Sequence, residues 1–237
     1  MPDPAITKSL APAGVLRASI NLGNPVMAQG TADAPAGVTV ELSRAIAGRL
    51  GVPVEFLCFD AARDSFDALR GGAADVGFLA IEPARAAEVW FTAPYVLIEG
   101  VFAVPDSSPL TRADEVDRDG VRIAVKDGSA YDLYLTRTLE RAELVRGPES
   151  IDVYRAQELN AVAGIRQPLS RVVTDDPTLR LVEPAFMQIR QAVATTPDRS
   201  AAAKAFLHDL VEQLKSDGFV AEALWNSGQD ATVAGPA

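Results

Sequence analysis

Apolar and polar positions alternate along the first half of the chain in a pattern that predicts strands followed by helices. Apolar runs over 16–22, 52–59 and 76–80 indicate strands. The segments 40–50 and 60–70 instead repeat apolar residues at helical spacing, and Gly71-Gly72 ends the second of them. This alternation is typical of an α/β fold whose mainly parallel sheet is covered on both faces.

The pattern restarts after 104–109, a connector rich in turn-forming residues. We predict strands over 121–125, 143–146, 160–165, 179–182 and 186–195, and helices over 129–140, 151–159, 169–173 and 200–225, the last broken at Asp217-Gly218. With 237 residues, the chain is long enough for one large domain or two small lobes.

Composition narrows the range of functions. A formal net charge of −10 argues against nucleic acid or an anionic membrane surface as a partner. The single cysteine, Cys58, lies in an apolar strand, where we expect a buried and inert thiol. With one Cys and one His, the chain has no material for a disulfide framework and almost none for a zinc or catalytic His/Cys centre. We therefore predict no metal and no cofactor.

The amino-terminal residues 1–14 lack a basic start and an apolar stretch, so they do not read as a secretory signal peptide. No window approaches the ~18 apolar residues of a membrane-spanning helix. Two explanations stay open: an export segment was removed, or the protein stays in the cytoplasm.

The segment 75–95, DVGFLAIEPARAAEVWFTAPY, is the most informative part of the chain. It reads as a strand, a polar turn that opens a short helix, and a second apolar strand. Arg85 follows the first strand, and ligands of open α/β sheets bind outside the carboxyl ends of the strands. An arginine at such a place is more often a solvated surface residue, so the interpretation depends on the sequence around it.

That surrounding sequence resembles the bacterial extracellular solute-binding proteins of family 3, which deliver amino acids and related acids to ABC transporters. Their signature has the form G-x-x-D-[apolar strand]-T-x-E-R-x-x-x-x-x-F-[ST]-x-P-Y. The matching positions are Gly71/Gly72, Asp75, Val76–Ala80, Arg85, Phe91, Thr92, Pro94 and Tyr95. The chain departs at Glu82, where the family has Thr, and at Ala84, where it has Glu. The resemblance extends from about residue 16 to about residue 225.

The resemblance implies a periplasmic-binding-protein-like fold of type II, with two α/β lobes joined by two crossover strands near 100–104 and 189–193. Lobe I would comprise 1–103 and 192–237, and lobe II would comprise 104–191. Periodicity alone does not predict this discontinuous first lobe.

The resemblance also implies a set of ligand-binding residues. In this family the arginine that matches Arg85 holds the ligand's carboxylate, and a guanidinium can do so with two parallel hydrogen bonds. From the second lobe, Gly128 and Ser129 stand at a predicted helix start, which favours an anion. An ordinary N-cap is the alternative for Ser129.

Other candidates carry weaker arguments. We predict ligand contacts for Ala80, Asn24, Gln191 and Tyr131. For Asn24 the alternative is a simple β-turn, and Gln191 could instead serve a hinge.

One departure bears on the ligand's identity. Amino-acid binders of the family carry a segment G-x-x-D-A-[apolar-apolar-x]-D, whose last Asp pairs with the α-ammonium group. Alignment on Asn160-Ala161 puts Ile165 at that position, followed by Arg166. A buried ammonium without its charge partner costs roughly 3–5 kcal/mol, about two to three decades of affinity.

This argument favours an organic acid or an amino-acid derivative, with Arg166 as a second cation for a more negative ligand. A standard amino acid is the alternative, in which Glu82, Asp127 or Glu99 binds the ammonium. For Arg166 the alternative is a surface residue just past a strand.

We therefore predict a non-enzymatic substrate-binding protein of an ABC importer that closes like a hinge on a small carboxylate. The resemblance implies a periplasmic protein with a membrane ABC permease as a further partner, and we expect a monomer. Two alternatives stay open: a cytoplasmic ligand sensor, and a cyclohexadienyl-dehydratase-like enzyme in which Glu82 would act.

Overall fold

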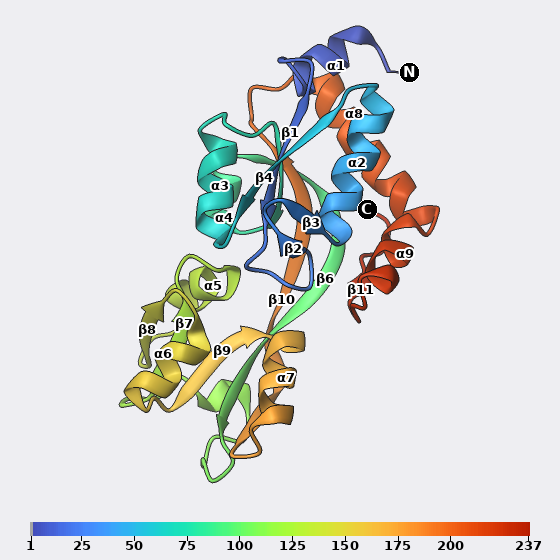
Figure 1. Cartoon of the computed structure of the whole chain (residues 1–237). Coiled ribbons are helices and arrows are strands. Elements are labelled where there is room, and N and C mark those ends of the chain that lie inside the picture. Colours follow the sequence, from blue (N-terminus) through green and yellow to red (C-terminus); the bar gives the residue numbers. More distant parts are fainter. Residues whose placement is uncertain (1) are drawn as a thin grey trace. The chain divides into compact units, whose positions relative to one another are not determined.

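The computed structural model describes residues 2–237 and confirms a mixed α/β fold (Figure 1). The chain divides into two compact units. Unit 1 holds Met1–Leu97 and Arg190–Ala237, and unit 2 holds Ile98–Ile189. Both chain connections between the units run along long strands, β6 (Trp90–Pro105) and β10 (Leu179–Thr195).

The predicted lobe boundaries, after residue 103 and before residue 192, fall on these same two strands and stay a prediction.

Unit 1 is built on strands in the order β4-β1-β5-β10. β1 is parallel to β4 and β5, whereas β10 is antiparallel to β5. Helix α3 lies on one side of β1 and β4, and α2 and α8 lie on the other (Figure 1). Besides its parts of β6 and β10, unit 1 contains α1 (Pro4–Leu10), β1 (Leu16–Asn21), β2 (Gln29–Thr31), β3 (Ala34–Ala36), α2 (Val38–Leu50), β4 (Val54–Phe59), α3 (Ala62–Arg70), β5 (Val76–Ala80), α4 (Pro83–Ala86), α8 (Ala201–Ser216), α9 (Phe219–Asn226) and β11 (Thr232–Val233).

Burial explains this strand order. All five residues of the continuous apolar run VGFLA in β5 are buried, as expected for a strand that is covered on both faces. Strand β4 has no fully buried residue and pairs with β1 alone. Cys58 on β4 is therefore half-buried, which corrects the prediction of a buried thiol.

Unit 2 repeats the architecture with strands in the order β6-β9-β7-β8. β7 is parallel to β8 and β9, and β9 is antiparallel to β6. A core of Val101, Ala103, Ala124, Leu159, Val162 and Leu169 joins the sheet to its helices. The elements are a 3-10 turn (Ala113–Glu115), β7 (Arg122–Lys126), α5 (Ala130–Thr138), β8 (Glu143–Gly147), α6 (Ser150–Gln157), β9 (Ala161–Ile165) and α7 (Arg166–Asp175).

The sequence pattern misses several short elements of this fold. Helix α1 and the hairpin β2-β3 are short and largely exposed, so they carry no apolar periodicity. The two strands predicted over 179–182 and 186–195 are one strand, β10, which continues through Pro184. Among the described residues, no helix is long and apolar enough to cross a membrane.

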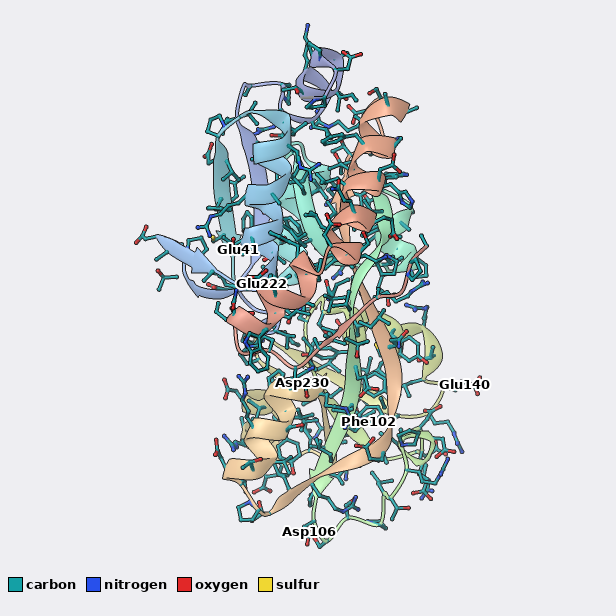
Figure 2. The ribbon with its side chains drawn as sticks, turned by 90° about the vertical axis from the view of Figure 1, so that its right-hand side faces the viewer. Glu41, Phe102, Asp106, Glu140, Glu222 and Asp230 are labelled. Atoms are coloured by element: carbon teal, nitrogen blue, oxygen red, sulfur yellow. The ribbon has the colours of Figure 1, made fainter. Side chains whose placement is uncertain are left out.

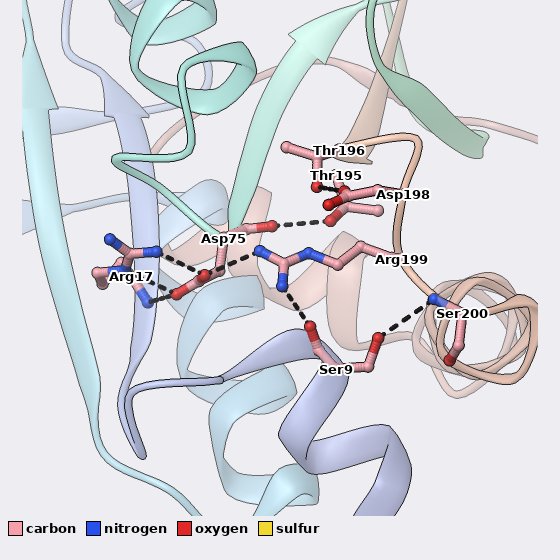
Figure 3. A network of polar contacts seen from close by, with 8 residues as sticks. All are labelled: Ser9, Arg17, Asp75, Thr195, Thr196, Asp198, Arg199 and Ser200. Atoms are coloured by element: carbon pink, nitrogen blue, oxygen red, sulfur yellow. Dashed lines mark hydrogen bonds and ion pairs between the residues drawn. The ribbon is translucent and has the colours of Figure 1, made fainter.

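A buried carboxylate, Asp75, ties distant parts of unit 1 together (Figure 3). Arg17 of β1 donates to both carboxylate oxygens, with Nε–Oδ2 and Nη2–Oδ1 distances of 3.0 and 2.8 Å. Arg199, just before α8, donates from Nη2 to Oδ1 at 3.0 Å, and its Nη1 donates to the carbonyl of Ser9 at the end of α1. The Asp75 carbonyl accepts a hydrogen bond from Thr195 of β10. Asp75 thus joins β1, β5, β10, α1 and the start of α8.

We expect Asp75→Ala to lower the free energy of unfolding by about 3–5 kcal/mol, because it leaves two largely enclosed arginines without their partner. The matched control is Asp67→Ala, which removes a half-exposed ion pair with Arg70 and should change stability by at most about 1 kcal/mol. Urea unfolding followed by circular dichroism measures both. Equal effects from the two substitutions would contradict a structural role for Asp75.

Candidate ligand-binding site

Unit 1 gathers four of the predicted residues at the carboxyl end of β5. Ala80 ends the strand, Glu82 is the N-cap residue of α4, and Arg85 lies on that short helix. Gln191 of β10 stands opposite Ala80 in the strand register. Each of the four is at most 5% exposed. We call Ala80, Glu82, Arg85 and Gln191 the unit 1 cluster.

The cluster holds a charged guanidinium in a dry environment. Burial lowers the pKa of Arg85 to about 10, and the nearby Glu82 carboxylate opposes that shift. Arg85 therefore keeps its positive charge at neutral pH. Its Nη1 donates to the Ala80 carbonyl at 3.4 Å, which orients the side chain back toward the end of β5. A buried cation that is pre-positioned in this way is suited to bind an anion.

Asn24 lies in the loop that follows β1, at the same sheet edge as the end of β5, because the two strands are parallel. The side chain is 7% exposed, and its Oδ1 accepts from the backbone N–H of Val26 at 3.3 Å. The Asn24 carbonyl accepts from Met27 and Ala28. These contacts fit the turn-forming alternative, and a ligand contact for Asn24 stays a prediction.

Unit 2 gathers three predicted residues at the start of α5. Gly128 ends the β7–α5 turn with a φ of +68°, a left-handed conformation that favours glycine. Ser129 is the N-cap, and its Oγ accepts from the N–H of Asp132 at 3.1 Å. Tyr131 follows in the first turn, and we call Gly128, Ser129 and Tyr131 the unit 2 cluster.

The capping hydrogen bond of Ser129 uses only one of the backbone N–H groups in the first turn of α5. Because the first N–H groups of a helix have no carbonyl partner within the helix, those of Ala130 and Tyr131 point out of it. The Ser129 hydroxyl accepts the capping bond through a lone pair, and the same side chain hydrogen-bonds Tyr131. Burial raises the pKa of Tyr131 to about 12, so its phenol stays neutral at neutral pH. The unit 2 cluster therefore also favours an anion.

Asp132 is a supporting residue that the sequence argument missed. It is buried and accepts from the Gly128 N–H at 2.9 Å and from Arg146 Nε at 3.0 Å. It thus fixes the glycine turn that precedes the cap. The S-x-x-D spacing of Ser129 and Asp132 is a capping-box pattern, a signal that was present in the sequence.

Arg166 lies at the start of α7, directly after β9, but carboxylates of unit 2 already surround it. Its Nε donates to Glu99, and its Nη1 and Nη2 donate to Glu183. The Glu183 and Glu99 carboxylates raise the pKa of Arg166, and the guanidinium lowers the pKa of Glu183. The charge of Arg166 is offset, so the geometry gives no support to a second cation for a more negative ligand.

Ile165 ends β9 and is the N-cap residue of α7, without a side-chain capping hydrogen bond. Asn160 just before the strand accepts from the N–H of Arg122 at 2.8 Å, which fixes where β9 begins. An aliphatic side chain therefore stands at the end of β9, and its equivalence to the acid of the family's motif stays a prediction.

No group of three or more metal-ligating side chains occurs within 2–237.

Comparison with known proteins places this architecture in a family. The model of the bacterial extracellular solute-binding proteins, family 3, matches residues 18–224. The chain belongs to this family, whose members bind small molecules outside the cytoplasmic membrane and deliver them to ABC permeases. No curated protein matches the chain.

Solved structures share the fold at low sequence identity. An arginine-binding protein mutant (P235GK) from T. maritima is 18% identical with a TM-score of 0.76, covering 94% of this chain and 99% of its own. The solute receptor for L-cysteine of Neisseria gonorrhoeae is 20% identical with a TM-score of 0.79, covering 93% and 92%. The ancestral amino-acid-binding protein AncCDT-1, a precursor of cyclohexadienyl dehydratase, is 18% identical with a TM-score of 0.74, covering 93% and 97%. These likenesses confirm a type II periplasmic-binding-protein fold.

The structural role of Ser129 can be separated from any ligand contact. Ser129→Ala should lower the free energy of unfolding by about 1 kcal/mol, because the cap of α5 is lost. Ser129→Gly should lower it by only a few tenths, because glycine is tolerated at an N-cap. Chemical denaturation measures both, and a larger loss for glycine than for alanine would contradict the capping role.

Proposed function

We propose that this protein is the substrate-binding component of an ABC importer and binds a small carboxylate. Arg85 of the unit 1 cluster would grip the carboxylate. Ser129 and the first N–H groups of α5, in the unit 2 cluster, are proposed separately as donors to an anionic group. The buried, charged guanidinium of Arg85 at the end of β5 is the observation that carries the proposal.

The absent acid at the end of β9 narrows the ligand class. An α-ammonium group brought to Ile165 would lose water without gaining a charge partner there. We therefore propose an organic acid or an amino-acid derivative rather than a standard α-amino acid.

A standard amino acid is the second candidate, and two observations favour it. Glu82 is buried beside Arg85, where its carboxylate could accept an ammonium group close to the bound carboxylate. The similar structures named above include an arginine-binding protein and a receptor for L-cysteine.

We further propose that the protein catalyses no reaction, acts as a monomer in the periplasm and meets a membrane permease. Family membership supports the transport role. Because likeness to AncCDT-1 concerns the fold, it does not assign a reaction to Glu82.

The first test is a thermal-shift panel on protein that has been unfolded and refolded to remove any carried-over ligand. The panel compares amino acids with matched keto, hydroxy, aromatic and dicarboxylic acids. A ligand at 100 times its Kd should stabilise the native state by ~2.7 kcal/mol. We expect acids without an α-amino group to raise Tm and Arg85→Ala to abolish the rise.

The matched control for that variant is Arg118→Gln, which removes a half-exposed arginine paired with Glu115. It should leave the ligand-induced rise in Tm unchanged. Stabilisation by amino acids alone would contradict the proposed ligand class, and an unchanged response in Arg85→Ala would contradict the proposed carboxylate contact.

A gain-of-function substitution tests the role of Ile165 directly. Ile165→Asp should raise the affinity for α-amino acids by about two to three decades, because it restores a charge partner worth roughly 3–5 kcal/mol. Ile165→Asn serves as the control, because asparagine has nearly the same shape as aspartate but carries no charge. Isothermal titration calorimetry measures both, and tight binding of a standard amino acid by the unchanged protein would show that another residue holds the ammonium.

A further inference from the structure

Unit 2 contains a cavity of about 410 Å³ that none of the predicted ligand-binding residues lines. Its walls come from β6, α5, β10 and the 3-10 turn, and all of its lining residues belong to unit 2. The volume falls within the range of small-molecule sites in proteins. No residue of the unit 1 cluster or the unit 2 cluster lines this cavity.

Three aromatic rings form one wall. Phe102 of β6 and Phe186 of β10 stack with a centroid distance of 4.3 Å and an interplanar angle of 28°. Tyr134 of α5 lies 6.0 Å from Phe186 at 31°. Phe102 is buried against Phe186, whereas Phe186 and Tyr134 are half-buried and line the cavity. Their rings provide π surface, which favours a planar aromatic partner. Figure 2 labels Phe102 on its strand.

A glycine makes this stack possible. A Cβ atom on Gly100 would lie 3.0 Å from Cζ of Phe186 and 2.7 Å from Cγ of Met187. With hydrogen at this position, the Phe186 ring lies directly over β6 and reaches Phe102. The aromatic wall is therefore built into the strand pairing of unit 2.

Arg112 is the cation among the residues that line the cavity, and a second guanidinium, that of Arg137, lies over the Tyr134 ring with its Cζ 5.3 Å from the ring centroid. Arg112 is exposed and donates from Nε to Asp114 at 3.1 Å. Within residues 2–237 the structure gives no acceptor to its two terminal amino groups. The other acid of the rim, Asp117, accepts from three backbone N–H groups, those of Glu140, Arg141 and Ala142, which lower its pKa. The Asp117 charge is thus dispersed over backbone dipoles, and Arg112 remains as the rim group available to a ligand.

We propose that this cavity is a second small-molecule site, which binds a planar aromatic anion. The ring system stacks against Phe186 and Tyr134, and the anionic group accepts hydrogen bonds from Arg112. The site is separate from the proposed carboxylate site and does not depend on it.

Two fluorescent probes test the proposal: 8-anilinonaphthalene-1-sulfonate, and its uncharged relative N-phenyl-1-naphthylamine. Both should bind the native protein at one site. Arg112→Gln should weaken sulfonate binding by about tenfold, the change expected for loss of a charge-assisted hydrogen bond, and leave binding of the uncharged probe unchanged. Thr138→Trp, at an exposed position on the cavity wall, should reduce the binding of both probes at least tenfold.

The controls separate this site from other modes of binding. Arg118→Gln should bind both probes like the unchanged protein, and so should Arg85→Ala, because the proposed carboxylate site lies elsewhere. Far-UV circular dichroism of each variant excludes probe binding to unfolded chain. Unchanged probe affinity in Thr138→Trp, or loss of sulfonate binding in Arg85→Ala, would overturn the proposal. Neither outcome would change the interpretation of the thermal-shift panel of amino acids and organic acids, which tests the proposed carboxylate site.

Discussion

The burial of a positive charge at the end of β5 is the constraint on which the candidate site depends. Arg85 is 3% exposed, and burial moves its pKa down to about 10 without removing its charge at neutral pH. A protein tolerates such a group only where acceptors surround it, and here Glu82 and the Ala80 carbonyl contribute. Under the proposed function, a bound carboxylate would stabilise this charge further, and ligand binding would then stabilise the cluster.

Contacts elsewhere in unit 1 fix the strand that precedes Arg85. Asp75 stands immediately before β5, and its carboxylate ties the strand to β1 and to the chain before α8. The signature thus contains two charged residues, of opposite sign and different tasks, on either side of one strand. Asp75 is satisfied entirely by the protein and fixes the strand, whereas Arg85, beyond the other end of the strand, is proposed to meet the ligand.

How far the sequence predicts this arrangement varies from element to element. The apolar run of β5 and the glycine turn before α5 could be placed, because each has a strong local signal. The pairing of Arg166 with Glu99 and Glu183 could not, because these partners are far away in sequence and meet only through the register of β6, β9 and β10. The hairpin β2-β3 and helix α1 lie at the surface and bury few apolar residues. Their sequences therefore carry no apolar periodicity that could predict them. The aromatic wall of the unit 2 cavity joins residues of three elements and has no motif at all.

A crystal structure with the most stabilising acid bound would test the central claim most directly. The account predicts two parallel N–H···O hydrogen bonds of about 2.7–2.9 Å from the Arg85 guanidinium to the ligand's carboxylate. A ligand whose carboxylate lies outside hydrogen-bond distance of Arg85 would contradict it.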